Sequence, residues 1–201
     1  KAYFAKTKFM FASSADLVTL ENDGSLYRVN PADGSWKQIG KSGDWSKTMV
    51  GAMIGNKLYT VEREGALYET NTANGTWRQL GKADFVRTKF LYATSDRLYS
   101  IEQIGSLFSI DPANGSWQQV GSSNDWGNTN RSTMHNGKLY STEGGALYET
   151  DPKTGVWKQI KTEYVRAKFL LGAGSFLYFI EFNGTLYRID PSNGSTTQIG
   201  K

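Results

Sequence analysis

Short hydrophobic runs alternate with turn residues along the whole chain. Each run spans only about 4–8 residues and is rich in β-branched and aromatic side chains, and Gly, Asn, Asp or Ser separates it from the next run. Runs of this length, bounded by turn residues, are typical of β-strands, whereas an amphipathic helix needs a longer stretch with a period near 3.6 residues. The pattern therefore predicts an all-β protein.

The hydrophobic runs recur with a period near 40 residues. Leu17 and its counterparts mark five copies, with spacings of 41, 40, 41 and 38 residues to Leu58, Leu98, Leu139 and Leu177. Each copy holds four runs, named strands a to d here; in the first copy they are residues 6–13, 17–21, 25–29 and 35–40. Four antiparallel strands in a unit of this length form a propeller blade. The sequence predicts a single domain over residues 1–201, a five-bladed β-propeller with blades at about 1–41, 42–82, 83–122, 123–161 and 162–201.

Two kinds of turn recur in every copy. The turn between strands b and c ends in Gly, and the turn between strands c and d opens with Asn or Asp and closes with Gly. Gly tolerates a positive φ, and Asn, Asp and Pro favour the opening positions of tight turns. All four prolines lie in the second kind of turn, at Pro31, Pro112, Pro152 and Pro191. The Gly and Pro residues therefore mark hairpins rather than a linker between domains.

The copies also differ in a way that repeats. Blades 2 and 4 share the sequence GALYET and an Asp-Trp pair before strand a, whereas blades 1, 3 and 5 have a bulkier strand a. Large side chains facing small ones fill the space between neighbouring sheets, which suggests descent from a two-blade unit. Gly200-Lys201 followed by Lys1 resembles the junction at Gly81-Lys82, so we expect a ring closed on five blades, with a part of a larger ring as the alternative.

Composition excludes several classes of chemistry. The chain has no Cys and one His, His135, so thiol nucleophiles, disulfides and Cys/His zinc sites are excluded. The net charge of +4 is spread without blocks of like charge, and no apolar run approaches the roughly 20 residues of a membrane helix. We expect no nucleic-acid partner and no membrane span. Because the chain starts at Lys1 rather than Met, we expect a processed protein with an extracellular or secreted location.

Candidate binding residues gather on one face of the predicted propeller, where the d–a junctions and the b–c turns emerge. An acid precedes an aromatic residue at the junctions, as Asp44-Trp45, Asp84-Phe85, Asp125-Trp126 and Glu163-Tyr164. Strand b ends in an acid at Glu21, Glu62, Glu102, Glu143 and Glu181, and strand a carries bases that include Lys89 and Lys168. An aromatic face beside carboxylates and amines suits the apolar side and the hydroxyls of neutral or N-acetylated sugars. We predict repeated shallow carbohydrate sites, whose number would supply avidity.

Other interpretations of these residues stay open. The junction aromatics fit packing between blades, and Glu21 would face Lys8 as a cross-strand ion pair if the a–b turn is tight. The Trp of strand d, at Trp36, Trp77, Trp117 and Trp157, is expected to pack between blades, with the Gln two residues later satisfying backbone groups. The lysines of strand a would hold an anion at the channel in a further alternative.

An enzyme is not expected. Propeller glycosidases need two carboxylates in different environments on inner strands, but no strand a contains Asp or Glu, and the acids of strand b are equivalent in every blade. The Asp and Asn residues of the c–d turns are explained by turn chemistry, so we predict neither a metal site nor a cofactor.

The repeat resembles the tachylectin-like, tectonin-related β-propeller lectins. The resemblance rests on Gly43-Asp44-Trp45, on the Leu-Tyr pairs at Leu58-Tyr59 and Leu67-Tyr68, on Trp77 and Gly81, and on residues 87–92. It implies five or six blades and pockets between them for N-acetylated sugars or lipopolysaccharide. We therefore predict a non-enzymatic glycan-binding propeller; the alternatives are a protein-protein interaction scaffold and a propeller module of a larger secreted protein.

Overall fold

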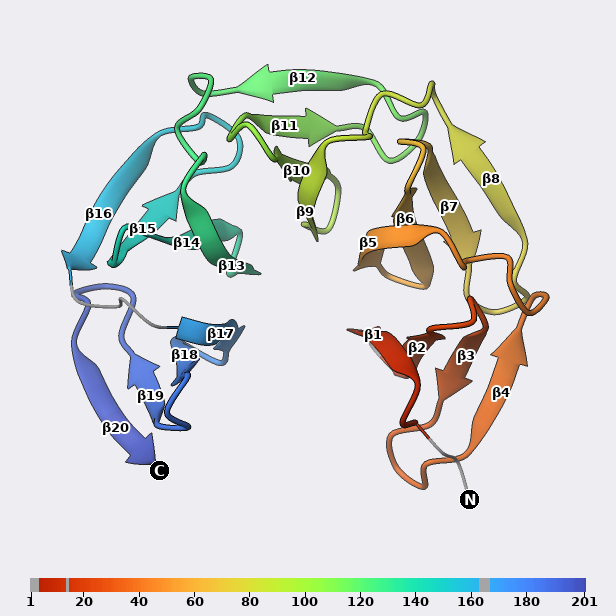
Figure 1. Ribbon diagram of the computed structural model, residues 1–201, viewed down its shortest axis with the longest axis horizontal. Helices are drawn as coiled ribbons and strands as arrows, with labels where there is room; N and C mark the ends of the chain where they lie inside the picture. The colour runs from red at the N-terminus through yellow and green to blue at the C-terminus, as the bar shows by residue number, and fades with distance from the viewer. Residues whose placement is uncertain (1–3, 14, 163–166) are drawn as a thin grey trace. The chain divides into compact units, whose positions relative to one another are not determined.

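The computed structural model describes residues 4–13, 15–162 and 167–201. In these residues the chain forms twenty strands in five antiparallel sheets of four, and each sheet keeps the chain order of its strands. This is the all-β five-bladed propeller that the repeat predicted, with one sheet for each blade (Figure 1).

The strands follow the predicted repeat in every blade. Blade 1 holds β1 (Thr7–Ala12), β2 (Leu17–Glu21), β3 (Leu26–Val29) and β4 (Trp36–Ile39), and blade 2 holds β5 (Thr48–Ile54), β6 (Lys57–Glu62), β7 (Leu67–Asn71) and β8 (Trp77–Leu80). Blade 3 holds β9 (Thr88–Ala93), β10 (Leu98–Glu102), β11 (Leu107–Ile110) and β12 (Trp117–Val120). Blade 4 holds β13 (Thr129–His135), β14 (Lys138–Glu143), β15 (Ala146–Thr150) and β16 (Trp157–Thr162), and blade 5 holds β17 (Ala167–Ala173), β18 (Phe176–Glu181), β19 (Leu186–Ile189) and β20 (Thr196–Gly200).

The chain divides into two compact units, which we describe separately. The first unit comprises Lys1–Ser100 with Ile110–Trp117, and the second comprises Ile101–Ser109 with Gln118–Lys201. The first therefore contains blades 1 and 2, the second contains blades 4 and 5, and the strands of blade 3 contribute to both.

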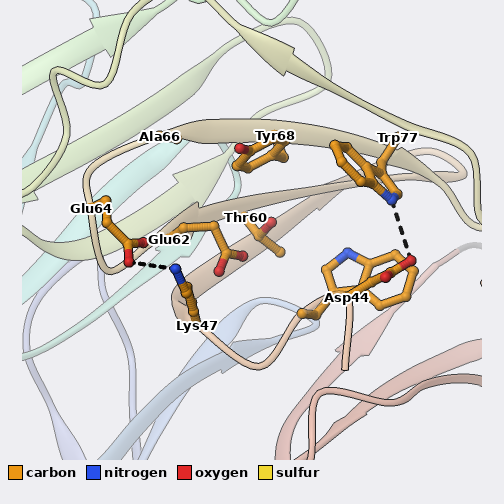
Figure 2. Close-up of a pocket in the computed structure, with 9 residues that line it drawn as sticks. Asp44, Lys47, Thr60, Glu62, Glu64, Ala66, Tyr68 and Trp77 are labelled. Atoms are coloured by element: carbon orange, nitrogen blue, oxygen red, sulfur yellow. Dashed lines mark hydrogen bonds and ion pairs between the residues drawn. The ribbon is translucent and has the colours of Figure 1, made fainter. Parts of the chain in front are cut away.

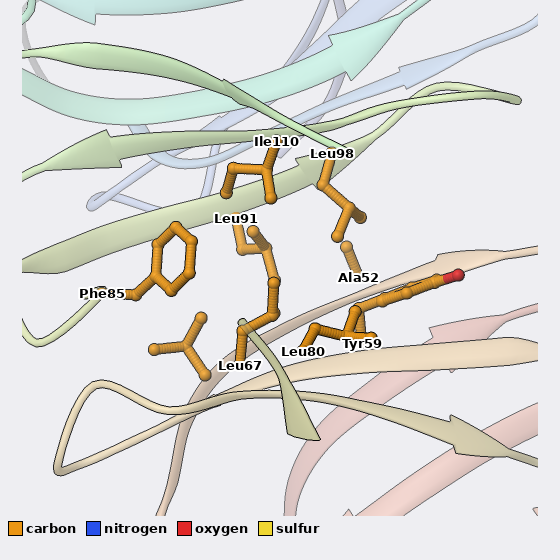
Figure 3. Packing of buried hydrophobic residues seen from close by; sticks show 9 residues of the cluster. Ala52, Tyr59, Leu67, Leu80, Phe85, Leu91, Leu98 and Ile110 are labelled. Atoms are coloured by element: carbon orange, nitrogen blue, oxygen red, sulfur yellow. The ribbon is translucent and has the colours of Figure 1, made fainter. Parts of the chain in front are cut away.

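In the first unit the hydrophobic core lies between neighbouring sheets. Phe85 packs with Leu67 and Leu80 of blade 2 and with Leu98 and Ile110 of blade 3 (Figure 3). Trp45 has the same position one blade earlier, among residues that include Leu26 and Leu58. Each junction aromatic thus fills the space that two flat sheets would leave open between them.

Large side chains face small ones across blades, in the predicted order between blades 1 and 2 and in the reverse order between blades 4 and 5. A Cβ added at Gly51 of blade 2 would meet the ring of Phe11 from blade 1. In the second unit, a Cβ at Gly172 of blade 5 would meet the ring of His135 from blade 4. His135 is buried at the end of β13, and its ring lies 6.4 Å from that of Tyr140. The single histidine is therefore accounted for by packing.

The start of strand a carries an irregularity that changes the predicted pairing of Glu21. In blades 1, 2, 4 and 5 the register between strands a and b shifts directly after the first paired residue, as between Thr7 and Phe9. One extra residue at this point redirects the side chains that follow. Glu21 therefore lies opposite Thr7, whose hydroxyl donates a hydrogen bond of 2.8 Å to its carboxylate. The expected pair between Glu21 and Lys8 was wrong for this reason.

Glycines of adjacent blades touch through their backbones. Gly75, in the c–d turn of blade 2, has a φ of 77°, and a Cβ there would collide with the backbone nitrogen of Gly40 at the end of blade 1. The same turn in blade 4 brings Gly155 against Gly121. A side chain at these positions would push neighbouring blades apart.

Gly75→Ala should therefore destabilise the protein more than Gly55→Ala. Gly55 also has a positive φ, 58°, but an added Cβ would meet nothing within 4 Å. We expect Gly55→Ala to cost about 1–2 kcal/mol for the left-handed backbone alone. Gly75→Ala should cost a further 1–3 kcal/mol, roughly, because the backbone must shift. Urea unfolding of both variants measures the difference, and equal losses would contradict the close contact.

Candidate functional site

A backbone hydrogen bond fixes each junction to the b–c turn of the preceding blade. The amide of Trp45 donates to the carbonyl of Gly24 at 3.2 Å, that of Phe85 to Gly65 at 2.9 Å, and that of Trp126 to Gly105 at 3.0 Å. The turn and the junction therefore meet at one edge of the blades, as predicted. This bond also fixes where the acid before each aromatic residue lies.

The junction aromatics themselves are buried. Trp45 is 2% exposed, and Phe85 and Trp126 are equally enclosed. The indole of Trp45 donates to the hydroxyl of Thr70 at 3.1 Å, and that of Trp126 donates to Thr150 at 3.2 Å. These rings pack between blades, so they cannot offer a face to a sugar ring. Glu163 and Tyr164, the fourth predicted pair, lie outside the described residues.

The tryptophans of strand d are exposed, which corrects the expectation that they pack between blades. Trp36, Trp77, Trp117 and Trp157 each expose 48–52% of their surface. Strand d is the last strand of its sheet, and its Trp lies against the Tyr of strand c on the same sheet face. The rings of Trp77 and Tyr68 meet edge to face, with centroids 5.4 Å apart and planes at 85°. Trp36 with Tyr27 and Trp157 with Tyr148 repeat this geometry.

The predicted acids of the junctions hold these exposed indoles. The Nε1–H of Trp77 donates to Asp44 at 3.4 Å, that of Trp117 to Asp84 at 3.1 Å, and that of Trp157 to Asp125 at 3.2 Å. Trp77 and Trp157 are thus each oriented by a Tyr ring and by a carboxylate, and the indole of Trp117 is held by Asp84. The predicted Gln contacts are confirmed in part, since Gln79 and Gln119 donate to the carbonyls of Gly81 and Gly121.

A pocket of about 320 Å³ opens beside Trp77 in blade 2 (Figure 2). Strand b contributes Thr60 and Glu62, and strand c with its turn contributes Glu64, Ala66 and Tyr68. Asp44, Trp45 and Lys47 come from the junction. In Figure 2, Thr60 and Glu62 lie between the pair of Lys47 with Glu64 and the pair of Trp77 with Asp44. The pocket therefore combines an aromatic wall with three carboxylates and one amine.

The acids of this pocket differ in their surroundings. Glu62 is 8% exposed, and burial raises the pKa of its carboxyl although the hydroxyl of Thr48 donates to it at 2.6 Å. Glu64 is exposed and pairs with the amine of Lys47 at 2.7 Å, which lowers the pKa of Glu64 and raises that of Lys47. The pocket thus has a buried acid at its base and an ion pair at its rim.

Blade 4 repeats the pocket at a smaller size, about 90 Å³. Asp125, Glu143, Tyr148 and Trp157 stand where blade 2 has Asp44, Glu62, Tyr68 and Trp77. Glu143 accepts from Thr129 at 2.6 Å and from Ser141 at 3.2 Å. The b–c turn of blade 4 is one residue shorter, so Glu64 has no counterpart there, and Asn128 replaces Lys47.

The remaining predicted residues do not line these two pockets. Glu21 bonds to Thr7 in blade 1, Glu181 accepts from the side chain of Asn183 at 3.0 Å, and Glu102 ends β10. The amines of Lys89 and Lys168 lie over the rings that follow them, Phe90 and Phe169, at 5.4 and 5.5 Å from the ring centroids.

Several pocket residues were not predicted from the sequence, namely Thr60, Glu64, Lys47, Tyr68 and Trp77 with Tyr148 and Trp157. The shared GALYET segment of blades 2 and 4 was a usable signal, because its Tyr is Tyr68 in one blade and Tyr148 in the other. Among the described residues, no cluster of three or more His, Cys, Asp or Glu could hold a metal ion. Nor do these residues include a helix with the length and apolarity needed to span a membrane.

Substitution of the two kinds of Trp should destabilise the protein to different extents. Trp45→Ala should cost about 3–5 kcal/mol of unfolding free energy, as for a buried Trp, whereas Trp77→Ala should cost only about 1–2 kcal/mol from its edge contact with Tyr68. Chemical denaturation followed by circular dichroism measures both. A larger loss in Trp77→Ala would contradict the assignment of Trp45 to packing.

Glu62→Gln should stabilise the protein at neutral pH. Burial raises the pKa of Glu62 in the folded protein above its value in the unfolded chain, about 4.3. The protonated carboxyl therefore contributes stability below the unfolded pKa, and this stability is lost as the pH rises through the folded-state pKa. The variant should therefore melt at a higher temperature than the wild type at pH 7, and the gain should vanish near pH 4. A variant less stable than wild type at pH 7 would contradict the burial cost.

Solved structures of low sequence identity share the fold. A chain of a nidogen/laminin complex matches with a TM-score of 0.77 and 11% identity, over 100% of this chain and 82% of that chain. YCF48 bound to D1 peptide matches with a TM-score of 0.69 and 13% identity, over 98% and 70% of the two chains. PorZ of Porphyromonas gingivalis matches with a TM-score of 0.65 and 16% identity, over 96% of this chain and 28% of that chain. These matches agree with a propeller but give no support to the lectin assignment.

The sequence comparisons identify a family. No curated protein matches the chain. Residues 22–161, more than half of the sequence, match the family model described as outer membrane protein assembly factor BamB. The chain therefore belongs to the family of outer membrane protein assembly factor BamB.

Proposed function

We propose that the chain is a non-enzymatic propeller that binds a segment of another protein through the aromatic pockets of blades 2 and 4. The observation that carries this proposal is the exposure of Trp77 and Trp157, each oriented by a Tyr ring and an Asp carboxylate. Trp and Tyr are enriched among the residues that dominate binding energy at protein interfaces. An indole already held in place loses little conformational entropy on binding.

The structural neighbours support a protein partner rather than a small substrate. The nidogen chain was solved in a complex with laminin, and YCF48 was solved with a D1 peptide. Their identities of 11% and 13% relate them to this chain by fold, so the partner of this chain is inferred from the pockets themselves.

The absence of a catalytic role is part of the proposal. The carboxylate of Glu62 accepts from Thr48, as Glu21 does from Thr7 and Glu143 from Thr129. A bond that recurs in three blades is a feature of the repeat rather than of one specialised site. The raised pKa of Glu62 therefore follows from burial at the end of strand b.

A carbohydrate ligand is the second candidate, and the pocket of blade 2 favours it. Trp77 offers a half-exposed ring beside Asp44 and Glu62, which could accept hydrogen bonds from sugar hydroxyls. The stacking role first predicted for the buried junction aromatics would then belong to the Trp of strand d.

Selection from a random peptide display library, with a glycan array in parallel, distinguishes the two candidates. We expect peptides that bind the wild type and lose at least about 30-fold in affinity in the Trp77→Ala/Trp157→Ala double variant, because interface anchors contribute about 2 kcal/mol or more each. Trp36→Ala is the matched control, since Trp36 has the same exposure and the same Tyr contact in blade 1.

Peptides that bind the double variant as well as the wild type would contradict the proposed site. Glycans that bind the wild type and are lost in the double variant, with no peptide selected, would establish the carbohydrate candidate instead.

A further inference from the structure

We propose that the pocket of blade 2 binds the guanidinium group of an arginine in the partner segment, and that the pocket of blade 4 is a second, weaker site of the same kind. This inference rests on the proposed function, and it specifies what the partner segment must contain.

The charge of the two pockets is the first argument. Asp44, Glu62 and Glu64 face a single amine, that of Lys47, so the blade 2 pocket has a formal charge of −2. The blade 4 pocket has the same charge, from Asp125 and Glu143. The chain as a whole carries +4. Two pockets of equal negative charge in a positive protein are matched by a cation rather than by a neutral ligand.

Among the residues that the structure describes, no cation forms an ion pair with Glu62. Within the described residues, Thr48 is its hydrogen-bond donor, and the pocket amine of Lys47 is bonded to Glu64. The amine of Lys8, whose charge also acts on Glu62, donates to the carbonyl of Thr48. Burial raises the pKa of Glu62 because the charged form is poorly solvated there. A guanidinium bound in the pocket would donate a hydrogen bond to the Glu62 carboxylate and place a positive charge beside it.

A buried hydroxyl without a partner points into the same pocket. Thr60 is fully buried, and its Oγ1 makes no hydrogen bond within the described residues, as is also true of Thr19 and Ser100 at the same position in blades 1 and 3. An unmade hydrogen bond in a buried site destabilises the folded protein, so a buried orphan group calls for an explanation. Because Thr60 lines the pocket beside Glu62 (Figure 2), an N–H donor bound there would satisfy both groups.

In blade 4 the corresponding hydroxyl has a hydrogen-bond partner. Ser141 stands at the position of Thr60, and its hydroxyl donates to Glu143 at 3.2 Å. That pocket is also smaller, about 90 Å³ against about 320 Å³. It therefore has less room and fewer unmet hydrogen bonds, which is why we assign it the weaker binding.

The aromatic wall selects arginine over lysine. Guanidinium is planar, stacks on aromatic rings and donates several hydrogen bonds in a fixed fork. In the blade 2 pocket, Trp77 and Tyr68 supply the rings, and Asp44, Glu62 and Thr60 supply acceptors at different depths. The ammonium of lysine would meet the charge requirement but would not reach several of these acceptors at once.

Titration of the uniformly ¹⁵N-labelled chain tests the inference through the indole N–H signal of Trp77, identified by its loss in Trp77→Phe. The probes are N-acetyl-arginine amide and N-acetyl-citrulline amide, which has nearly the same shape but no charge. We expect a saturable shift with the arginine probe and at least tenfold weaker binding of the citrulline probe.

Variants separate the pocket from general electrostatics. Glu62→Gln should weaken arginine binding at least fivefold, whereas Asp96→Asn, which removes an acid bonded to Thr94 in blade 3, should leave it unchanged. Thr60→Val removes the orphan hydroxyl with little change of shape. It should bind arginine at least twofold more weakly while its melting temperature stays equal to or above that of wild type, an outcome that a purely structural role of Thr60 would not produce.

Four results would overturn the inference: no shift with the arginine probe, equal binding of the citrulline probe, unchanged arginine binding in Glu62→Gln, or a shift of the same indole by N-acetylglucosamine without one by arginine. The peptide selection distinguishes a failure of this inference from a failure of the proposed function. Peptides that require Trp77 but contain no arginine would overturn the inference and leave the protein-binding function standing.

Discussion

The hydrogen bond between a glycine carbonyl of one blade and the junction amide of the next is the constraint on which the site depends. It brings the backbone of Gly24 against Trp45 and Ser46 so closely that a side chain at Gly24 would collide with Ser46. The aromatic ring of the junction then enters the space between two sheets, and the acid before it is left at the surface. Asp44 and Asp125 reach the exposed indoles of strand d because this bond fixes the chain one residue later.

The same arrangement assigns opposite roles to the two kinds of tryptophan. Trp45 and Trp126 are buried and donate to threonines of strand c, so they hold neighbouring blades together. Trp77 and Trp157 lie on the last strand of the sheet and remain half exposed. The repeat therefore uses the first pair for packing and leaves the second pair, with Tyr68 and Tyr148, at the surface.

The sequence predicted the blades well because turn chemistry and the spacing of Leu17 and its counterparts are local signals. It also predicted which face carries the acids, since strand direction follows from the hairpins. It did not predict the partner of Glu21, because the register shift after Thr7 depends on how strand a bends within the sheet. The exposure of Trp77 was missed for a related reason: whether a ring on an edge strand is covered depends on the neighbouring blade, and the sequence of one blade does not contain that information.

In our proposal, Trp77 and Glu62 form a preorganised site for an arginine of a partner protein. The most direct test of this proposal is a crystal structure of the chain with an arginine-containing peptide obtained by selection. We expect a guanidinium in the blade 2 pocket, in contact with the Trp77 ring and hydrogen-bonded to the Glu62 carboxylate and the Thr60 hydroxyl. A peptide bound elsewhere on the propeller, or bound here with its arginine in solvent, would contradict it.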